Sequence, residues 1–144
     1  MLDTVDPEFA SYVDARQGRW FRTAYLVYGE LGRAEHALLH AFTRLSLRWP
    51  KVDDPDVFVQ RLLYQPALTR WSRLRPFPET EDPVEQALAE LTPTQRTILV
   101  LLYLEELTEF EVADILTMSH TAVHAQGLSA FGRFQKAIKA GESR

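Results

Sequence analysis

The sequence contains no cysteine, and this absence excludes several kinds of chemistry. Without Cys among its 144 residues, the chain cannot form disulfides, thiolate metal sites or a cysteine nucleophile. Glycine is also scarce, and the six glycines do not form a glycine-rich phosphate loop. No nucleophile is paired with a base, and Asp53-Asp54 beside Pro55 is typical of a helix cap. We therefore expect a protein that is not an enzyme and binds no cofactor.

Long hydrophobic runs are missing as well. No segment approaches the length of about 18 apolar residues that spans a bilayer. The N-terminal sequence has neither a basic start nor an uninterrupted apolar stretch. We therefore expect no membrane insertion and a cytoplasmic location. The apolar content of 46% is typical of a globular chain, so the sequence can form a packed core.

The charges are unevenly distributed along the chain. Residues 16–75 hold eleven Lys/Arg and five acids, whereas residues 76–116 hold one Arg and ten acids. A basic first half can face nucleic acid, and an acidic middle is repelled from it. Solvated helix faces explain the same pattern, and the charges alone do not decide between these interpretations.

Two aspartate-proline pairs mark helix starts in the first half. In Asp6-Pro7 and Asp54-Pro55 the acid can accept from free backbone N–H groups, and proline suits the first turn. The first pair predicts a helix to about Tyr28, and the second predicts a helix from residue 55 onward. Because proline inside a helix costs roughly 3 kcal/mol, Pro66 predicts a kink or break near residues 64–65.

A further helix is predicted between these two. Gly29 and Gly32 are expected to end the first helix, and from Arg33 the apolar residues recur at a spacing of three or four. Pro50 is expected to end this pattern. The repeating residues are Ala34, Ala37, Leu38, Ala41, Phe42, Leu45 and Trp49.

Residues 76–83 divide the chain into two predicted domains. This segment holds three prolines and three acids but has no apolar period, which is typical of a linker. It separates a domain over residues 1–75 from a domain over residues 84–144. We expect an all-α fold of two small helical domains joined by this Pro/acid-rich linker.

The second predicted domain carries a helix-turn-helix pattern. The segment Thr92-Pro93-Thr94-Gln95 is a capping box, and it opens a helix whose apolar run is expected to be buried nearly all round. Thr108 begins a second capping box, and Ser119 can cap another helix three residues after Leu116. Two helices joined by such a turn form a helix-turn-helix. The predicted inner face of the last helix consists of Val123, Gly127, Ala130, Phe131, Phe134 and Ile138.

Taken together, these motifs resemble the extracytoplasmic-function (ECF) sigma factors, compact two-domain members of the sigma-70 family. The similarity covers nearly the whole chain, and its order and spacing are more specific than any single motif. In the first domain the matching motifs are Thr23-Ala24-Tyr25-Leu26-Val27, Gly29, Arg33-Ala34-Glu35, Ala41-Phe42, Arg48-Trp49, Asp54-Pro55, Phe58-Val59, Arg61 and Trp71. In the second they are residues 88–96, 102–105, 107–109 and 111–116.

The resemblance implies that the RNA polymerase core and promoter DNA are partners. In such proteins the first domain binds the polymerase clamp and melts and reads the minus-ten element. The first-domain DNA surface implied by position consists of Lys51, Arg61, Gln65, Arg70, Trp71, Arg73 and Arg75. Arginines can follow phosphates, and aromatic side chains can stack on unpaired bases. Trp71 is equally explained as a core residue, and the arginines as solubilising side chains.

The resemblance also implies that the helix-turn-helix reads the minus-thirty-five element. The DNA-binding residues implied there are Ser119, His120, Thr121, His124, Gln126 and Arg133. The family commonly has Gly at the position of Thr117 and basic residues at His124 and Gln126. Because Lys and Arg neutralise phosphates and donate to guanine, we expect weak DNA binding. Gly127 replaces an apolar residue and is expected to soften the helix by about 1 kcal/mol.

The contact with polymerase or another partner is expected on the second helix. The residues implied are Glu35, His36, Leu39 and His40. The family usually has Asp at His36 and Gln at Leu39, so two polar contacts are replaced. This departure motivates a second hypothesis, a degenerate sigma mimic that binds an anti-sigma factor or another regulator and has weak or no DNA binding. A third interpretation, a two-component-style DNA-binding output domain, leaves residues 1–75 unexplained.

Two histidine pairs lie one helical turn apart. His36 and His40, and likewise His120 and His124, have the spacing at which imidazoles share a metal ion or act as a pH switch. Neither pair has an obvious third ligand in the sequence. We therefore interpret them as exposed or partner-facing side chains and predict no metal site.

Overall fold

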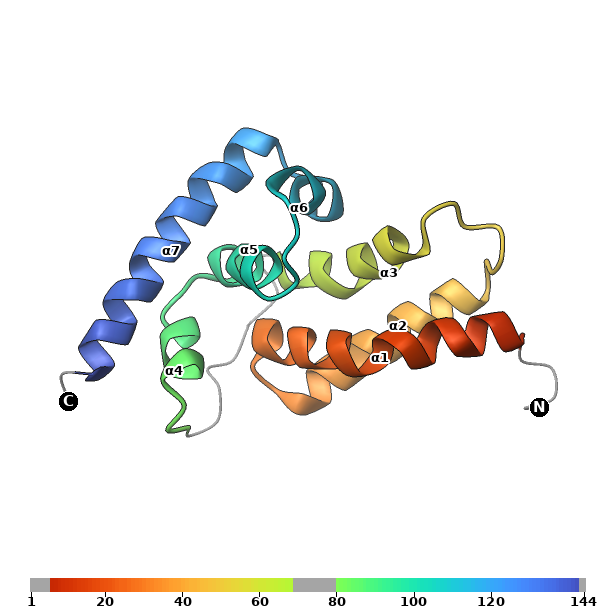
Figure 1. Ribbon diagram of the computed structural model, residues 1–144, viewed down its shortest axis with the longest axis horizontal. Helices are drawn as coiled ribbons and strands as arrows, with labels where there is room; N and C mark the ends of the chain where they lie inside the picture. Colours follow the sequence, from red (N-terminus) through yellow and green to blue (C-terminus); the bar gives the residue numbers. More distant parts are fainter. Residues whose placement is uncertain (1–5, 69–79, 143–144) are drawn as a thin grey trace.

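The computed structural model describes residues 6–68 and 80–142, and all regular elements within these residues are helical. This confirms the predicted all-α fold. Figure 1 shows α1 and α2 side by side, with α5 between α1 and the C-terminal helix α7. The elements are α1 (Pro7–Tyr28), α2 (Leu31–Ser46), α3 (Pro55–Tyr64), the 3-10 helix η2 (Gln65–Leu68), α4 (Pro83–Ala89), α5 (Pro93–Tyr103), α6 (Glu109–Leu116) and α7 (His120–Glu142).

The helix starts follow the predicted caps. The Asp6 carboxylate accepts a hydrogen bond from the backbone N–H of Glu8 at 2.8 Å, and Asp54 accepts from Val57 at 3.2 Å. Both capping boxes are formed, the first at the start of α5 and the second at the start of α6. These local signals fix where each helix begins because they satisfy backbone donors that have no partner inside the helix.

Two predicted helix ends need correction. Gly29 does end α1, with a φ of 76°, but Gly32 lies in the first turn of α2 rather than outside it. α2 ends at Ser46, before Trp49, and the N–H groups of Arg48 and Trp49 turn back to the carbonyl of Leu45. The early end has a physical reason, because Pro50 has no N–H to donate to the carbonyl of Ser46 four residues earlier, and it also disfavours helical conformation at Trp49.

The break predicted at Pro66 is confirmed. α3 ends at Tyr64, and the chain continues in η2, which contains Pro66. Tyr64 is fully buried at this point. The α-helix therefore gives way to a 3-10 turn at Pro66, while Tyr64 stays in the core.

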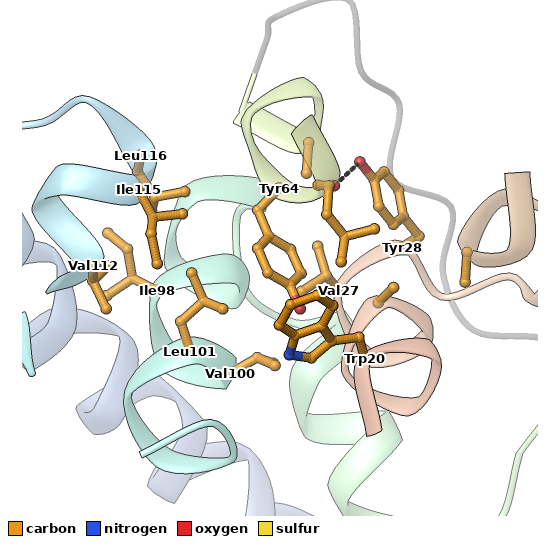
Figure 2. Close-up of a cluster of buried hydrophobic side chains, with 14 of the residues drawn as sticks. Trp20, Val27, Tyr28, Tyr64, Ile98, Val100, Leu101, Val112, Ile115 and Leu116 are labelled. Carbon is orange, nitrogen blue, oxygen red and sulfur yellow. Dashed lines mark hydrogen bonds between the residues drawn. The ribbon is translucent and has the colours of Figure 1, made fainter. Parts of the chain in front are cut away.

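The hydrophobic core is continuous across the two halves of the chain. Figure 2 shows Trp20 and Val27 of α1 and Tyr64 of α3 close to Val100 and Leu101 of α5, and all five are fully buried. α5 is buried at every position from Gln95 to Leu101, as predicted for a central helix. Helices from both halves thus share one core, and the division into two domains stays a prediction. The predicted linker ends in α4, which begins at Pro83.

Candidate nucleic-acid interface

The helix-turn-helix is formed by α6, the turn Thr117–Ser119 and α7. Thr117 has a φ of 55°, a left-handed conformation that costs a β-branched residue about 1–2 kcal/mol. The backbone N–H of Met118 donates to the carbonyl of Ala113 at 3.0 Å. The hydroxyl of Ser119 accepts from the N–H of Ala122 at 3.0 Å and so caps α7. The predicted motif and its Ser119 cap are therefore confirmed.

α7 packs closely on α5 through Gly127. A Cβ atom at this position would lie 3.2 Å from Cδ1 of Leu102, so the absent side chain lets the two helices approach. Val123 and Ala130 are buried on the same face. The prediction that Phe131 belongs to this inner face was wrong. It lies at the edge of the face, 38% exposed, and its ring stacks on Tyr103 with centroids 5.5 Å apart.

The two histidines of the recognition helix are bound by one carboxylate. Glu109 lies 2.8 Å from Nδ1 of His124 and 3.3 Å from Nε2 of His120. The ring of Phe110 stacks on His120 with centroids 4.1 Å apart. The first turns of α7 therefore present imidazoles that α6 holds in place, next to a negative charge. Within residues 6–68 and 80–142, no three metal-ligating side chains form a group that could hold a metal ion.

The other predicted residues of the recognition helix differ in accessibility. Thr121 is exposed and Gln126 is half-buried. The guanidinium of Arg133 donates to the side chain of Gln95 at 2.9 Å and to the carbonyl of Glu90 at 3.0 Å. It therefore ties α7 to α5 and to the end of α4. A contact of these residues with DNA stays a prediction.

Two predicted DNA-binding residues of the first half contact the helix-turn-helix instead of standing free. Nη2 of Arg61 donates to the carboxylate of Asp114 at 2.6 Å, and Nε donates to its carbonyl at 3.3 Å. Nε2 of Gln65 donates to the carbonyl of Ile115 at 2.9 Å and to the hydroxyl of Thr117 at 3.0 Å.

Of the other predicted DNA-binding residues in the first half, the structure describes one. Lys51 is exposed in the loop before α3. Four predicted residues lie outside the described part of the chain, namely Arg70, Trp71, Arg73 and Arg75.

The predicted partner-contact residues share the exposed side of α2. Glu35, His36, Leu39 and His40 are all exposed, and Leu39 is 65% exposed. Leu39 borders a shallow cavity of about 360 Å³ between α1 and α2. Its lining combines apolar side chains, including Phe9 and Phe42, with polar ones, including Gln17 and Glu35. An apolar side chain beside an apolar hollow is typical of a protein contact.

Buried polar groups join the two halves near α5. The guanidinium of Arg96 donates to the carbonyls of Val27 and Leu88, each at 3.1 Å, and burial lowers the pKa of Arg96 to about 10. Glu105 accepts from the hydroxyl of Thr23 at 2.5 Å and lies 3.3 Å from Nε of Arg19. These contacts hold α5 and the residues that follow it against α1.

Three contact residues were absent from the predicted site. Glu109 and Asp114 lie on α6 and Thr117 lies in the turn, where each contacts a predicted DNA-binding residue. Glu109 and Asp114 lie within motifs that carry the resemblance, but nothing in the local sequence marked them as partners of DNA-binding residues. Their partners lie 11 or more positions away in sequence, so a search for short motifs could not pair them.

Comparison with known proteins gives a match to a protein family and a similar protein. Residues 81–126, which contain α4, α5, α6 and the start of α7, match the family described as "Sigma-70, region 4". This segment is thus similar to region 4 of the sigma-70 family, and the similarity to a sigma factor extends over nearly the whole chain.

The relative is the RNA polymerase sigma-E factor of Streptomyces coelicolor. It is 27% identical over 155 aligned positions, which cover 92% of this chain and 87% of the relative. Within the described residues, no helix combines the length and the apolar character needed to cross a membrane.

Proposed function

We propose that this protein is a sigma factor that directs bacterial RNA polymerase to promoters. The helix-turn-helix of α6 and α7 carries the proposal, because it lies inside the matched region 4 segment and presents α7 as a recognition helix. In this role α7 reads the minus-thirty-five element, and the first half reads the minus-ten element. The family similarity over most of the chain supports both halves of the proposal.

The recognition helix binds DNA weakly by itself. α7 has no Lys or Arg before Arg133, and Arg133 is hydrogen-bonded to Gln95 and Glu90. Because cationic side chains supply most of the affinity for phosphates, few counterions are released on binding. His120, His124 and Gln126 can still hydrogen-bond to bases. The protein therefore depends on polymerase to reach its promoter.

The α2 face is the proposed contact with polymerase. It combines the carboxylate of Glu35 with His36, Leu39 and His40, all exposed. The test is gel-filtration co-elution of the purified chain with core RNA polymerase. The comparison is the double variant His36→Asp, Leu39→Gln, and the matched control is Leu47→Gln, which changes another exposed leucine close to the end of α2.

Co-elution of the unmodified chain supports the sigma-factor role. Absence of co-elution that the double variant restores would contradict that role and favour the second candidate function, a sigma mimic that binds an anti-sigma factor or another regulator. Two observations favour this alternative, namely the carboxylate of Glu109 beside the recognition helix and the exposed Leu39 beside an apolar cavity. An apolar protein contact would persist at salt concentrations that abolish DNA binding.

A further inference from the structure

Glu109 shares its carboxylate between two imidazoles of the recognition helix. Oε2 of Glu109 lies 2.8 Å from Nδ1 of His124, and Oε1 lies 3.3 Å from Nε2 of His120. The two helices are neighbours at this place, where α6 lies beside the first turns of α7 (Figure 1). Each imidazole therefore faces its own carboxylate oxygen, but the two rings use different nitrogens.

The contact with Glu109 decides which nitrogen of His124 carries the hydrogen. An ionised carboxylate only accepts hydrogen bonds, so Nδ1 of His124 is the donor in the contact of 2.8 Å. In a neutral imidazole the other nitrogen is then an acceptor. Nε2 of His124 is consequently left as an acceptor at the far end of a side chain that is 54% exposed.

His120 is held differently and offers less to a ligand. It faces Glu109 with Nε2, the nitrogen at the far end of its ring, and the ring of Phe110 stacks on His120 with centroids 4.1 Å apart. Its other nitrogen, Nδ1, is the one closer to its own backbone. His120 therefore helps to hold the carboxylate in place, whereas His124 offers its outer nitrogen to a ligand.

The side chains around His124 on the exposed side of α7 are neutral. Thr121, Ala125 and Leu128 are exposed, and Leu128 lies one helical turn after His124. In the major groove adenine presents an amino group and its partner thymine presents a methyl group. Cytosine also presents an amino group, but its partner guanine has no methyl group. An acceptor beside an exposed leucine therefore complements an A·T pair better than a G·C pair.

We infer that Glu109 is a positioning residue, which fixes His124 in the tautomer that accepts a hydrogen bond from the amino group of adenine. His124 is then a specificity-determining residue of α7 and selects an A·T pair in the minus-thirty-five element. The inference rests on the proposed function, because it assumes that α7 enters the major groove of DNA. It adds a base preference to that function and names the acidic side chain of α6 that sets the preference.

The first test measures which base pair the protein selects. The probe is a duplex library with ten randomised base pairs, incubated with the purified chain at low salt and at pH 8, where free imidazole is neutral. The bound duplexes are sequenced. We expect the unmodified chain to prefer A·T about fivefold at one position, which corresponds to about one hydrogen bond. The absence of any A·T preference in duplexes that the chain does select would overturn the inference.

Glu109→Ala is expected to have two opposite effects on DNA binding. The A·T preference should fall below about twofold, because His124 is no longer held in one tautomer. The overall affinity should rise about twofold or more, because a negative charge beside the phosphates is removed. The control Glu142→Ala removes an exposed carboxylate at the other end of α7 and should keep the preference. An A·T preference that survives in Glu109→Ala would contradict the positioning role.

His124→Gln separates positioning from a structural role of Glu109. Glutamine can bond to adenine through its own amide, so this variant should keep the A·T preference. Adding Glu109→Ala to His124→Gln should then change the preference by less than about twofold. Loss of the preference in this background as well would show that Glu109 only maintains the structure of α6, and the inference would be wrong.

The tautomer is measured directly by ¹⁵N NMR of the imidazole nitrogens in the unmodified chain at pH 8. The signals of His124 are those that disappear in His124→Gln. We expect a protonated Nδ1 and an unprotonated Nε2. The opposite tautomer would overturn the inference even if Glu109→Ala does not fold.

Failure of the proposed function gives a different result. If no chain selects any duplex while His124 shows the expected tautomer, the DNA role of α7 is wrong, and the base preference falls with it. If the unmodified chain selects duplexes and both Glu109→Ala and His124→Ala select the same ones, only the inference is wrong and the DNA role stands.

Discussion

The two halves of this protein meet at two junctions that differ in burial. At the buried junction, between α1 and α5, Arg96 is 3% exposed and donates to the carbonyl of Val27, and the Glu105 side chain is 2% exposed and accepts from Thr23. At the second junction, which we call the polar junction, Arg61 and Gln65 contact the end of α6 and the following turn, at Asp114, Ile115 and Thr117. The ion pair of Arg61 and Asp114 at this junction is exposed to water.

This difference in burial decides how strongly each junction holds the two halves together. Hydrogen bonds in a low-dielectric interior are costly to break, because each partner left behind is buried without a replacement. Exposed ion pairs contribute about 0–1 kcal/mol and weaken as salt rises. The buried junction therefore holds the halves together, while the polar junction is weak enough to open.

The largest expected loss of stability follows substitution of Arg96. Arg96→Ala leaves the carbonyls of Val27 and Leu88 without this donor and creates a cavity beside α5. We expect a loss of about 3 kcal/mol in the free energy of unfolding, measured by urea denaturation with circular dichroism. Arg22→Ala, an exposed arginine on α1, serves as the control and should lose less than about 0.5 kcal/mol. Equal losses would mean that the buried junction does not stabilise the fold.

The next effect concerns Tyr28, which is adjacent to Val27. Its hydroxyl donates to the carbonyl of Leu63 at 2.7 Å, and burial raises the pKa of Tyr28 to about 12 from the usual 10. Because the folded state holds this proton more tightly, its contribution is complete below pH 10 and is lost as the pH rises toward 12. We expect the unmodified chain to lose about 2–3 kcal/mol over this range through Tyr28.

Comparison with Tyr28→Phe isolates this titration. The variant lacks the hydrogen bond and should be about 1 kcal/mol less stable at pH 9. The difference should shrink as the pH rises and reverse before pH 12, as followed by urea midpoints. A difference that stays constant with pH would show that the phenol is accessible to water.

The smallest expected effect on the free energy of unfolding is at the polar junction. Arg61→Ala and Asp114→Ala should each reduce the free energy of unfolding by less than about 1 kcal/mol. A double-mutant cycle should give a coupling energy of about 0.5 kcal/mol at low salt, which falls toward zero at high salt. A coupling that is as large as the effect of Arg96→Ala, or that does not change with salt, would remove the contrast between the junctions.

Local features of the fold could be predicted because their causes lie within a few residues. The caps at Asp6, Thr92 and Thr108, the break at Pro66 and the turn before Ser119 depend on side chains that bind neighbouring backbone groups. The early end of α2 was missed because Pro50 also removes the hydrogen bond to the carbonyl of Ser46, four residues before it.

Contacts between distant segments could not be predicted in the same way. Arg61 and Asp114 are separated by 53 positions, and no periodicity relates them. The candidate DNA residues were placed by resemblance, which assigns a side chain a role but not its partner. The resemblance to ECF sigma factors could be recognised from the order of the motifs, whereas the hydrogen-bond partners of Arg61, Gln65 and Arg133 required the structure.

The close approach of α7 to α5 at Gly127 couples the movements of these two helices. The Cβ site of Gly127 lies only 3.2 Å from Leu102, so α7 lies directly against α5 here. Interiors packed this tightly transmit displacement. α5 in turn packs on α1. A tilt of the recognition helix in a DNA groove therefore displaces α5 against α1, so the orientation of one half of the protein on DNA constrains the orientation of the other.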